Sequence, residues 1–223
     1  MRIIKNFFKV KSKFLKKLST QNTRSIFKTV RIGEQVWMAE NLNVAHYRNG
    51  ERICHVQDEK RWNDLESGAW CYYRDDPEEG KIYGRLYNWH AVNDPRGLAP
   101  EGWHIPSDEE WKILEKYLGM TKAEVEKEGL RGTGVGGKMK EAGQDHWCTP
   151  NVGANNASGF CALAGGFRIE YGDLSGDSHA QFWSSTENSH LTAWSRFLYY
   201  GSSKVSRGPS KKYFGFSIRC IKD

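Results

Sequence analysis

A glycine-rich string near the middle of this 223-residue chain has the residue types that phosphate binding requires. Gly132 to Met139 reads GTGVGGKM and satisfies both GxGxxG and GxxxxGK, whose backbone amides cradle phosphate at the start of a helix. The surroundings argue against this chemistry. No apolar strand precedes the string, and Met139 stands where a Ser or Thr would reach magnesium. We therefore predict that the string is not a nucleotide site.

One cysteine and two histidines raise the question of nucleophilic catalysis, which needs a nucleophile with a base in hydrogen-bond reach. Cys148 lies two residues from His146, a spacing at which side chains usually diverge. His104 lies within a motif of core-forming residues, so we expect a buried imidazole whose hydrogen bonds are satisfied. The sequence therefore predicts no catalytic residue, no metal site and no cofactor.

The residues best suited to binding lie between about 187 and 209. Tyr, Trp and Arg supply rigid contact area and hydrogen bonds, a mixture that binding surfaces favour. Alternation along this segment predicts that Trp194, Leu198 and Tyr200 fill the inner face of a sheet. The candidates for exposed ligand contacts are then Asn188, His190, Arg196 and Tyr199.

Helix signals are clearest in the middle of the chain. Ser107 and Glu110 form a capping-box pattern, and apolar residues then share one helix face until Gly119. Thr121 and Glu124 repeat the pattern and predict a shorter second helix.

Strand signals come both before and after these helices. The runs 29–32 and 35–38 flank Gly33–Glu34, a glycine-first pair that predicts a hairpin with a type II′ turn. Residues 43–80 read as loops with one strand near 69–73, and three further alternating runs follow in the last third of the chain. Two helices followed by antiparallel strands predict an α+β fold.

Charge separates the chain into two parts. Residues 1–33 contain ten Lys or Arg and no acid, whereas the remainder has slightly more acidic than basic residues. We therefore divide the chain into a basic segment, 1–28, and a body, 29–223, whose own charge argues against a polyanion-binding protein. No apolar stretch approaches the roughly 18 residues that cross a bilayer.

The basic segment has an amphipathic pattern. Apolar residues recur at three- and four-residue steps through residues 3–18, which predicts a helix with one apolar stripe opposite lysines. Such a helix suits an anionic membrane surface, the groove of a partner or, less specifically, nucleic acid. A solvated extension without a role is the equal alternative.

Seven segments carry a family resemblance: Val30 to Leu42, Tyr83 to Trp89, Gly102 to Trp111, Ser158 to Phe160, Gly165 to Arg168, Phe182 to Thr186 and Gly215 to Asp223. In this order they resemble the Fibrobacter succinogenes major paralogous domain, a bacterial family similar in fold to C-type lectins and to formylglycine-generating sulfatase-modifying enzymes. The resemblance covers about 29–223. It implies a C-type-lectin-like fold with two helices, small twisted antiparallel sheets and long irregular loops. It also implies that the glycine-rich string from Gly132 to Met139 is a surface loop.

Most landmark residues of these segments are large and apolar, which is typical of a core that is filled by rings. Ten Phe, ten Tyr and nine Trp support this interpretation. The predicted structural core comprises Trp37, Trp103, His104, Trp111, Phe160, Trp183, Phe216 and Cys220.

The cysteines depart from the pattern that the resemblance implies. Members of the family often carry a Cys positioned to pair with the Cys of the terminal strand, but Ala99 stands there, which leaves Cys220 without that partner. Five cysteines and no signal peptide favour the cytoplasm, although the family implies exported or surface proteins. Two bridges remain open: Cys54 with Cys71, and Cys148 with Cys161.

Trp62–Asn63–Asp64 reproduces a triplet that helps to hold calcium beside a sugar in C-type lectins. Here it precedes the first predicted helix instead of lying on a late strand. Calcium needs six to eight oxygen ligands, and only Asp173, Asp177 and Glu187 are even loosely grouped. We expect a turn closed by Asn63 and Asp64 rather than a metal site.

The function favoured by the sequence is a non-catalytic recognition module that binds a protein or a glycan through the loops between about 187 and 209. No specific nucleic-acid partner is expected. One alternative is an enzyme related to the formylglycine-generating sulfatase modifiers. The other is a structural or display protein.

Overall fold

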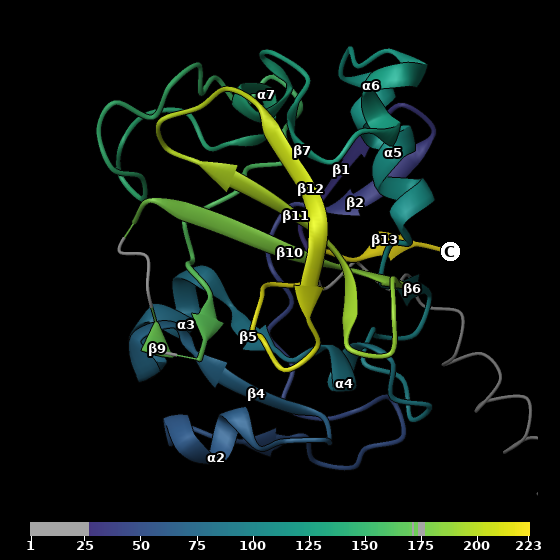
Figure 1. The fold of residues 1–223 in the computed structure, drawn as a ribbon, viewed down its shortest axis with the longest axis vertical. Helices are drawn as coiled ribbons and strands as arrows, with labels where there is room; N and C mark the ends of the chain where they lie inside the picture. The colour runs from purple at the N-terminus through teal and green to yellow at the C-terminus, as the bar shows by residue number, and fades with distance from the viewer. Residues whose placement is uncertain (1–26, 171, 174–176) are drawn as a thin grey trace, which may run out of the picture.

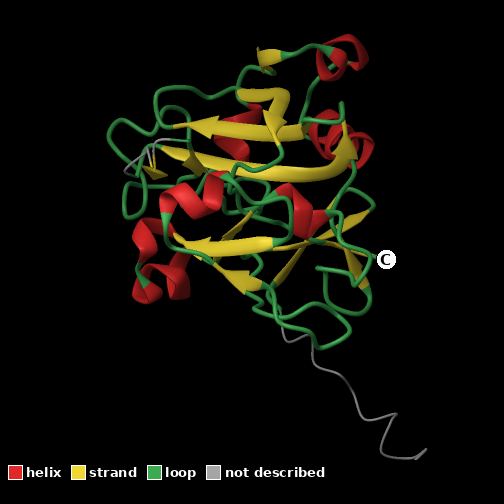
Figure 2. Ribbon diagram, turned by 60° about the horizontal axis from the view of Figure 1, so that its bottom comes forward, coloured by secondary structure: helices red, strands yellow, loops and turns green. Residues whose placement is uncertain are grey.

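The computed structural model describes residues 27–170, 172–173 and 177–223 (Figure 1). The predicted amphipathic segment, residues 1–18, lies outside this part of the chain. Within it the fold is α+β, as predicted, with six short α-helices, one 3₁₀ helix and four small sheets. Figure 2 shows long loops between the strands and short helices around them.

The first sheet brings the two ends of the described chain together. Its strands, in spatial order, are β1 (Thr29–Ile32), β2 (Gln35–Met38), β13 (Ile221–Lys222) and β6 (Trp103–His104). The predicted β1–β2 hairpin is confirmed, and Gly33 alone of its two turn residues has a positive φ, 61°, as a type II′ turn requires. Ile221 pairs with Trp37 on one side and with His104 on the other.

The second sheet contains the longest strands and is antiparallel throughout. In spatial order it consists of β10 (His179–Glu187), β11 (Thr192–Tyr199), β12 (Val205–Lys211) and β7 (Gly129–Arg131). One row across it contains Phe182, Arg196 and Arg207, and the adjacent row contains Gln181, Phe197 and Ser206. Because side chains alternate along a strand, the two rows point to opposite faces.

Two smaller sheets complete the strand inventory of the described residues. The third consists of β3 (Cys54–His55), β4 (Ala69–Tyr72) and β5 (Arg85–Tyr87), in which β4 confirms the strand predicted near 69–73. The β3–β4 pair is parallel, unlike the other pairs. The fourth is the ribbon of β8 (Arg168–Ile169) and β9 (Gly172–Asp173).

Two helices were predicted, and both are present with complete capping boxes: α5 (Asp108–Tyr117) and α6 (Lys122–Glu126). The expectation of only two helices is wrong. The structure adds α2 (Glu59–Asn63), η1 (Tyr73–Asp75), α3 (Pro77–Tyr83), α4 (Trp89–Val92) and α7 (Val135–Met139). Each is too short to show a helical period, and three rely on Asx N-caps at Asp58, Asp76 and Asn88.

None of the described helices has the length and apolar character that crossing a membrane would require.

The glycine-rich string is not the surface loop that was predicted, because most of it forms the buried helix α7. A Cβ at Gly136 would lie 2.3 Å from the backbone oxygen of Lys204, and one at Gly137 would lie 2.1 Å from that of Gly153. These contacts are shorter than any real side chain allows. The glycines therefore permit close packing of backbones, which explains the string without a phosphate.

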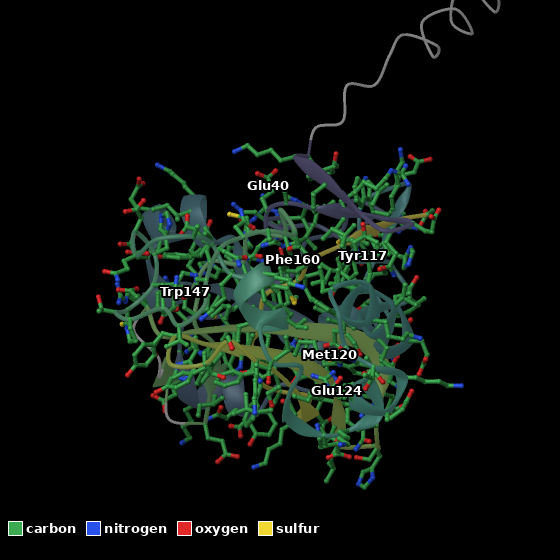
Figure 3. All side chains as sticks on the ribbon, turned by 90° about the horizontal axis from the view of Figure 1, so that it is seen from above. Glu40, Tyr117, Met120, Glu124, Trp147 and Phe160 are labelled. Carbon is green, nitrogen blue, oxygen red and sulfur yellow. The ribbon has the colours of Figure 1, made fainter. Side chains whose placement is uncertain are left out.

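Seven of the eight predicted core residues are buried. Trp37, Trp111 and Phe160 share one cluster, in which the indole centroids of Trp37 and Trp111 lie 4.9 Å apart. Figure 3 shows Phe160 among the side chains of this part of the molecule. The other members, Trp103, Trp183, Phe216 and Cys220, belong to a second cluster.

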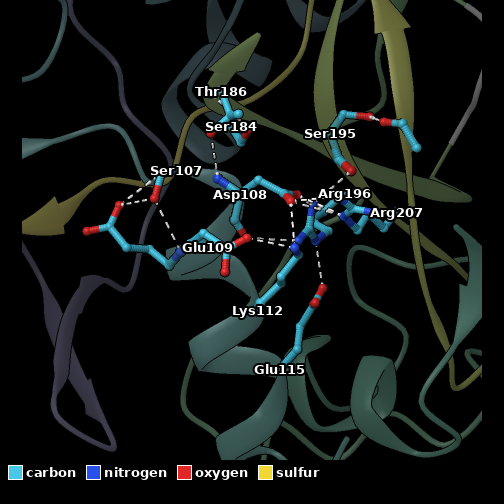
Figure 4. A network of polar contacts seen from close by, with 12 residues as sticks. Ser107, Asp108, Glu109, Lys112, Glu115, Ser184, Thr186, Ser195, Arg196 and Arg207 are labelled. Carbon is cyan, nitrogen blue, oxygen red and sulfur yellow. Dashed lines mark hydrogen bonds and ion pairs between the residues drawn. The ribbon is translucent and has the colours of Figure 1, made fainter. Parts of the chain in front are cut away.

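Helix α5 packs on the second sheet through a buried ion network (Figure 4). Asp108 accepts from Arg196 Nη1 and from Arg207 Nη2, both at 2.7 Å. Glu115 is fully buried two turns further along the same face of α5, and it accepts from Arg196 Nε and from Arg131 Nη2, both at 2.6 Å. The three arginines come from β11, β12 and β7, so α5 ties three strands together.

The network keeps the carboxylate of Asp108 charged. Burial raises the pKa of Asp108, but the hydrogen bond from Arg207 and the charge of Arg196 outweigh it and lower the pKa to about 2. Lys112 contributes at the margin, where it binds Glu109 at 2.7 Å and Glu126 at 2.6 Å.

Glu115→Ala tests this network. Its removal leaves Arg131 and Arg196 buried without their shared carboxylate, so we expect the free energy of unfolding to fall by about 3–5 kcal/mol. Urea denaturation followed by tryptophan fluorescence measures the change. The matched control is Glu109→Ala in the same helix. The side chain of Glu109 is 73% exposed and Lys112 keeps its ion pair with Glu126, so the expected loss is less than about 1 kcal/mol. Equal losses in the two variants would contradict the assigned role.

Candidate functional site

The four residues predicted to contact a ligand do not lie together. Asn188 and His190 are exposed in the turn between β10 and β11, where Asn188 Nδ2 donates to Thr192 Oγ1 at 3.0 Å. Tyr199 is partly exposed at the end of β11. The prediction that Arg196 is exposed is wrong, because its guanidinium is fully buried between the two carboxylates of α5.

The inner face of β11 also differs from the prediction. Leu198 is buried in the core cluster, as expected, and Tyr200 packs partly against it. Trp194 is only partly buried, and its ring covers the guanidinium of Arg207 at 3.6 Å. The reason is the charge network, which places Arg196 and Arg207 on the inner face that the sequence assigned to aromatic and aliphatic residues.

His190 lines a hollow of about 620 Å³ at the turn between β10 and β11. Leu191, 63% exposed, and Lys212 share its wall. Lys212 is engaged elsewhere, because it pairs with Glu187 and lies 4.6 Å from the Trp89 ring centroid. This hollow mixes acidic, basic and apolar groups without a dominant chemistry.

A second hollow, of about 300 Å³, lies on the outer face of the second sheet, the face opposite α5. We call it the sheet hollow. Its lining residues are Phe167, His179, Gln181, Ser195, Phe197, Ser206, Gly208, Pro209 and Ser210. Most come from the central stretches of β10, β11 and β12, so the backbone beneath them is held by a continuous hydrogen-bonded ladder.

Aromatic rings cover one side of the sheet hollow. The His179 ring stacks on Phe197 with centroids 4.9 Å apart, and on Tyr199 with centroids 5.0 Å apart. Phe167 meets the same imidazole edge-on at 5.7 Å. Tyr199, one of the predicted ligand residues, thus extends the ring surface beside the hollow.

Hydroxyl and amide groups line the other side. Ser195 Oγ donates to the backbone oxygen of Gly208 at 3.2 Å and lies 3.0 Å from Ser210 Oγ. Gln181 Nε2 reaches Ser210 at 3.4 Å. Among the described residues, the Ser206 hydroxyl and the Gln181 amide oxygen have no hydrogen-bond partner, which leaves them available to a ligand.

Gly208 opens the floor of the hollow. A Cβ built at this position would have no atom within 4 Å, and its φ lies outside the left-handed region. The absent side chain therefore leaves space without being required by backbone geometry.

Most of these lining residues escaped the sequence prediction. The available signal was the alternation along β11, which places Phe197 on the same face as Tyr199. Gln181 and Ser206 lie on that face too, but in the neighbouring strands. The apolar residues of the opposite parity suggested which side faces inward, but nothing in one strand indicates which residues of its neighbours stand beside it.

His104 belongs to a separate cluster and differs in burial from what the sequence predicted. Its hydrogen bonds are satisfied, by Glu110 Oε1 at 2.7 Å and Asp223 Oδ1 at 2.8 Å. However, its side chain is 39% exposed, so it is not the buried core residue that was predicted. Because both ring nitrogens are engaged, the imidazole joins the cap of α5 to the C-terminal end of the chain.

The remaining motifs have structural explanations. Trp62 and Asn63 end α2 instead of forming the predicted turn, and Trp62 Nε1 donates to the backbone oxygen of Tyr213 at 2.7 Å. Of the acids considered for calcium, Asp177 pairs with Arg74 and Glu187 with Lys212. Across the described residues, no group of three or more His, Cys, Asp or Glu side chains is arranged to hold a metal ion.

None of the five cysteines is disulfide-bonded, so neither of the two bridges left open by the sequence forms in this structure. Cys220 is buried, and burial raises the pKa of its thiol to about 12. A thiol in this environment is a packing group rather than a nucleophile.

The His104 cluster predicts a pH dependence of stability. Burial lowers the pKa of His104, but hydrogen bonds to Glu110 and Asp223 outweigh it, so the pKa lies above its usual 6.5. Stabilisation by the charged imidazole is therefore complete below the unfolded-state pKa and disappears as the pH rises through the raised folded-state value. We expect His104→Gln to lose more unfolding free energy near pH 6 than near pH 9.

Urea unfolding at the two pH values measures this difference. His190→Gln is the control, since His190 is exposed and forms no ion pair within the described part of the chain. A penalty for His104→Gln that is the same at both pH values would show that the cluster does not depend on the imidazole charge.

The sequence model of the Fibrobacter succinogenes major domain family matches residues 30–222. No curated protein matches the chain, and no solved structure matches it. The family match covers nearly all of the chain and agrees with the seven aromatic and glycine segments from which the resemblance was drawn. The chain therefore belongs to the Fibrobacter succinogenes major domain family.

Proposed function

We propose that this chain is a non-catalytic recognition module that binds a protein or a glycan on the outer face of the second sheet. The observation that carries the proposal is the sheet hollow, in which stacked rings face open hydroxyl and amide groups over a rigid backbone. Concave surfaces that combine apolar area with a few polar groups are typical of binding sites. The site includes β11 and β12, within the predicted 187–209 region, and adds residues of β10.

The chemistry of the hollow favours binding over catalysis. The imidazole of His179 is stacked on Phe197 and Tyr199, and its Nδ1 lies 2.6 Å from Ser178 Oγ. The other polar groups are neutral hydroxyls and an amide, which hold ligands by hydrogen bonds but are weak acids and bases. Elsewhere, the histidine best supplied with carboxylates, His104, uses both ring nitrogens to join α5 to the C-terminus. These features weigh against the alternative of an enzyme related to the formylglycine-generating modifiers.

A C-type-lectin-like architecture is part of this proposal. It is supported by the meeting of the two ends of the described chain in the first sheet, where β2 pairs with β13. It is supported also by the position of α5 and α6 in the sequence before the long strands β10 to β12. The predicted contact of residues 1–18 with an anionic membrane is a separate proposal, because that segment lies outside the described residues.

Phe197→Ala tests the proposed site. Its removal takes away the ring at the centre of the outer face, so we expect at least a tenfold loss of binding to whichever probes the intact protein recognises on glycan and peptide arrays. Tyr117→Ala is the matched control, since it removes a 65% exposed ring from α5 on the opposite side of the sheet. Thermal unfolding checks that both variants fold.

Two results would contradict the proposal. One is binding that Phe197→Ala retains in full, which would place recognition elsewhere. The other is failure of the intact protein to bind any probe on either array.

A further inference from the structure

The charge of the sheet hollow restricts the class of ligand, an inference that rests on the proposed function. None of the described residues that line it is Asp, Glu, Lys or Arg, and His179 is its one ionisable side chain. Nucleic acids and acidic polymers bind through Lys or Arg that neutralise their charges. The hollow offers no such partner, although the chain as a whole carries a net charge of +6. Its chemistry suits an uncharged ligand.

The rings of the hollow require an apolar surface on that ligand. The planes of Phe197 and Tyr199 lie within 11° of each other, and the imidazole of His179 lies within 27° of both. Because the three rings are stacked on one another, a ligand reaches the stack from the side that lines the hollow, where Phe197 stands. A pyranose has a matching surface, since its axial C–H groups form an apolar face that packs on an aromatic ring.

The polar groups of the hollow match the rim of the same kind of molecule. Gln181 and Ser206 lie on either side of Phe197 in one row across the sheet, so polar groups flank the central ring. A hydroxyl and an amide both donate and accept hydrogen bonds, as sugar hydroxyls do. The Ser206 hydroxyl and the Gln181 amide oxygen make no hydrogen bond to any described residue and are free for this purpose.

An extended peptide is the less suitable occupant. Peptides commonly bind a sheet by adding a strand to an open edge, where backbone groups are unpaired. The hollow instead lies on the face of β11, whose two edges are already paired with β10 and β12. The backbone groups of β11 are therefore already paired, and at the centre of the hollow its side chains remain to recognise a ligand.

We propose that the sheet hollow binds an uncharged glycan, with the apolar face of a sugar ring on Phe197 and its neighbouring rings and the sugar hydroxyls on Gln181 and Ser206. A volume of about 300 Å³ is at the lower limit for small-molecule pockets, which suits one or two sugar units rather than a long buried segment.

Affinity electrophoresis of the full chain tests this proposal. Native gels containing a soluble neutral β-glucan, xyloglucan or mannan measure retardation by uncharged glycans, and a gel containing heparin measures retardation by a polyanion. We expect retardation by at least one neutral polysaccharide, unchanged between about 50 and 500 mM NaCl because no counterions are released. Any retardation by heparin, for which the basic N-terminal segment is available, should disappear at high salt.

Two variants place the binding in the hollow. Phe197→Ala removes the central ring, and Gly208→Val fills the open floor. The second variant should fold normally, because a Cβ at position 208 has no atom within 4 Å and valine suits a strand. Each should weaken the neutral-glycan interaction at least tenfold, whereas Tyr117→Ala should leave it unchanged. Thermal unfolding shows which variants remain folded.

The outcomes test the proposed glycan ligand separately from the proposed recognition function. Phe197-dependent binding to peptides, without retardation by any neutral polysaccharide, would overturn the proposal of a glycan ligand but support a recognition module. Neutral-glycan retardation that survives both Phe197→Ala and Gly208→Val would overturn the sheet hollow as its site. Absence of binding to every polysaccharide and every peptide would overturn both proposals together.

Discussion

The structure depends on a buried network of ion pairs between α5 and the second sheet. Asp108 and Glu115 project from one helix and engage Arg131, Arg196 and Arg207 from three strands. Buried charges are costly unless they are paired with good geometry, so each carboxylate constrains where the arginines stand. The helix position and the strand alignment are therefore linked through the same hydrogen bonds.

This network also determines which face of the sheet is available to a ligand. Side chains alternate along a strand, so a single-residue slip would exchange the two faces. With Arg196 and Arg207 turned toward α5, the adjacent residues Phe197 and Ser206 must face outward. The rings and hydroxyls of the sheet hollow thus owe their orientation to charged residues that no ligand touches.

The rest of the molecule surrounds this unit with a core filled largely by rings. Trp37 of the first sheet packs against Trp111 of α5. Trp183 packs against Phe216 with ring centroids 4.3 Å apart. Close backbone approach supplements the rings, most clearly at Gly136 and Gly137 in α7. These requirements explain why aromatic and glycine positions carry the family resemblance although they say little about the ligand.

The sequence alone was sufficient to predict features that depend on residues close together in the sequence. The β1–β2 hairpin follows from the Gly33 turn, and the starts of α5 and α6 follow from their capping boxes, since each involves groups within four residues. Tyr199, which was expected to be exposed, is partly exposed. Only the tertiary structure decided that Arg196 is buried and that Gln181, Phe197 and Ser206 stand in one row, because the groups that pair with Arg196 lie more than 80 residues away in sequence and the row requires the register of three strands.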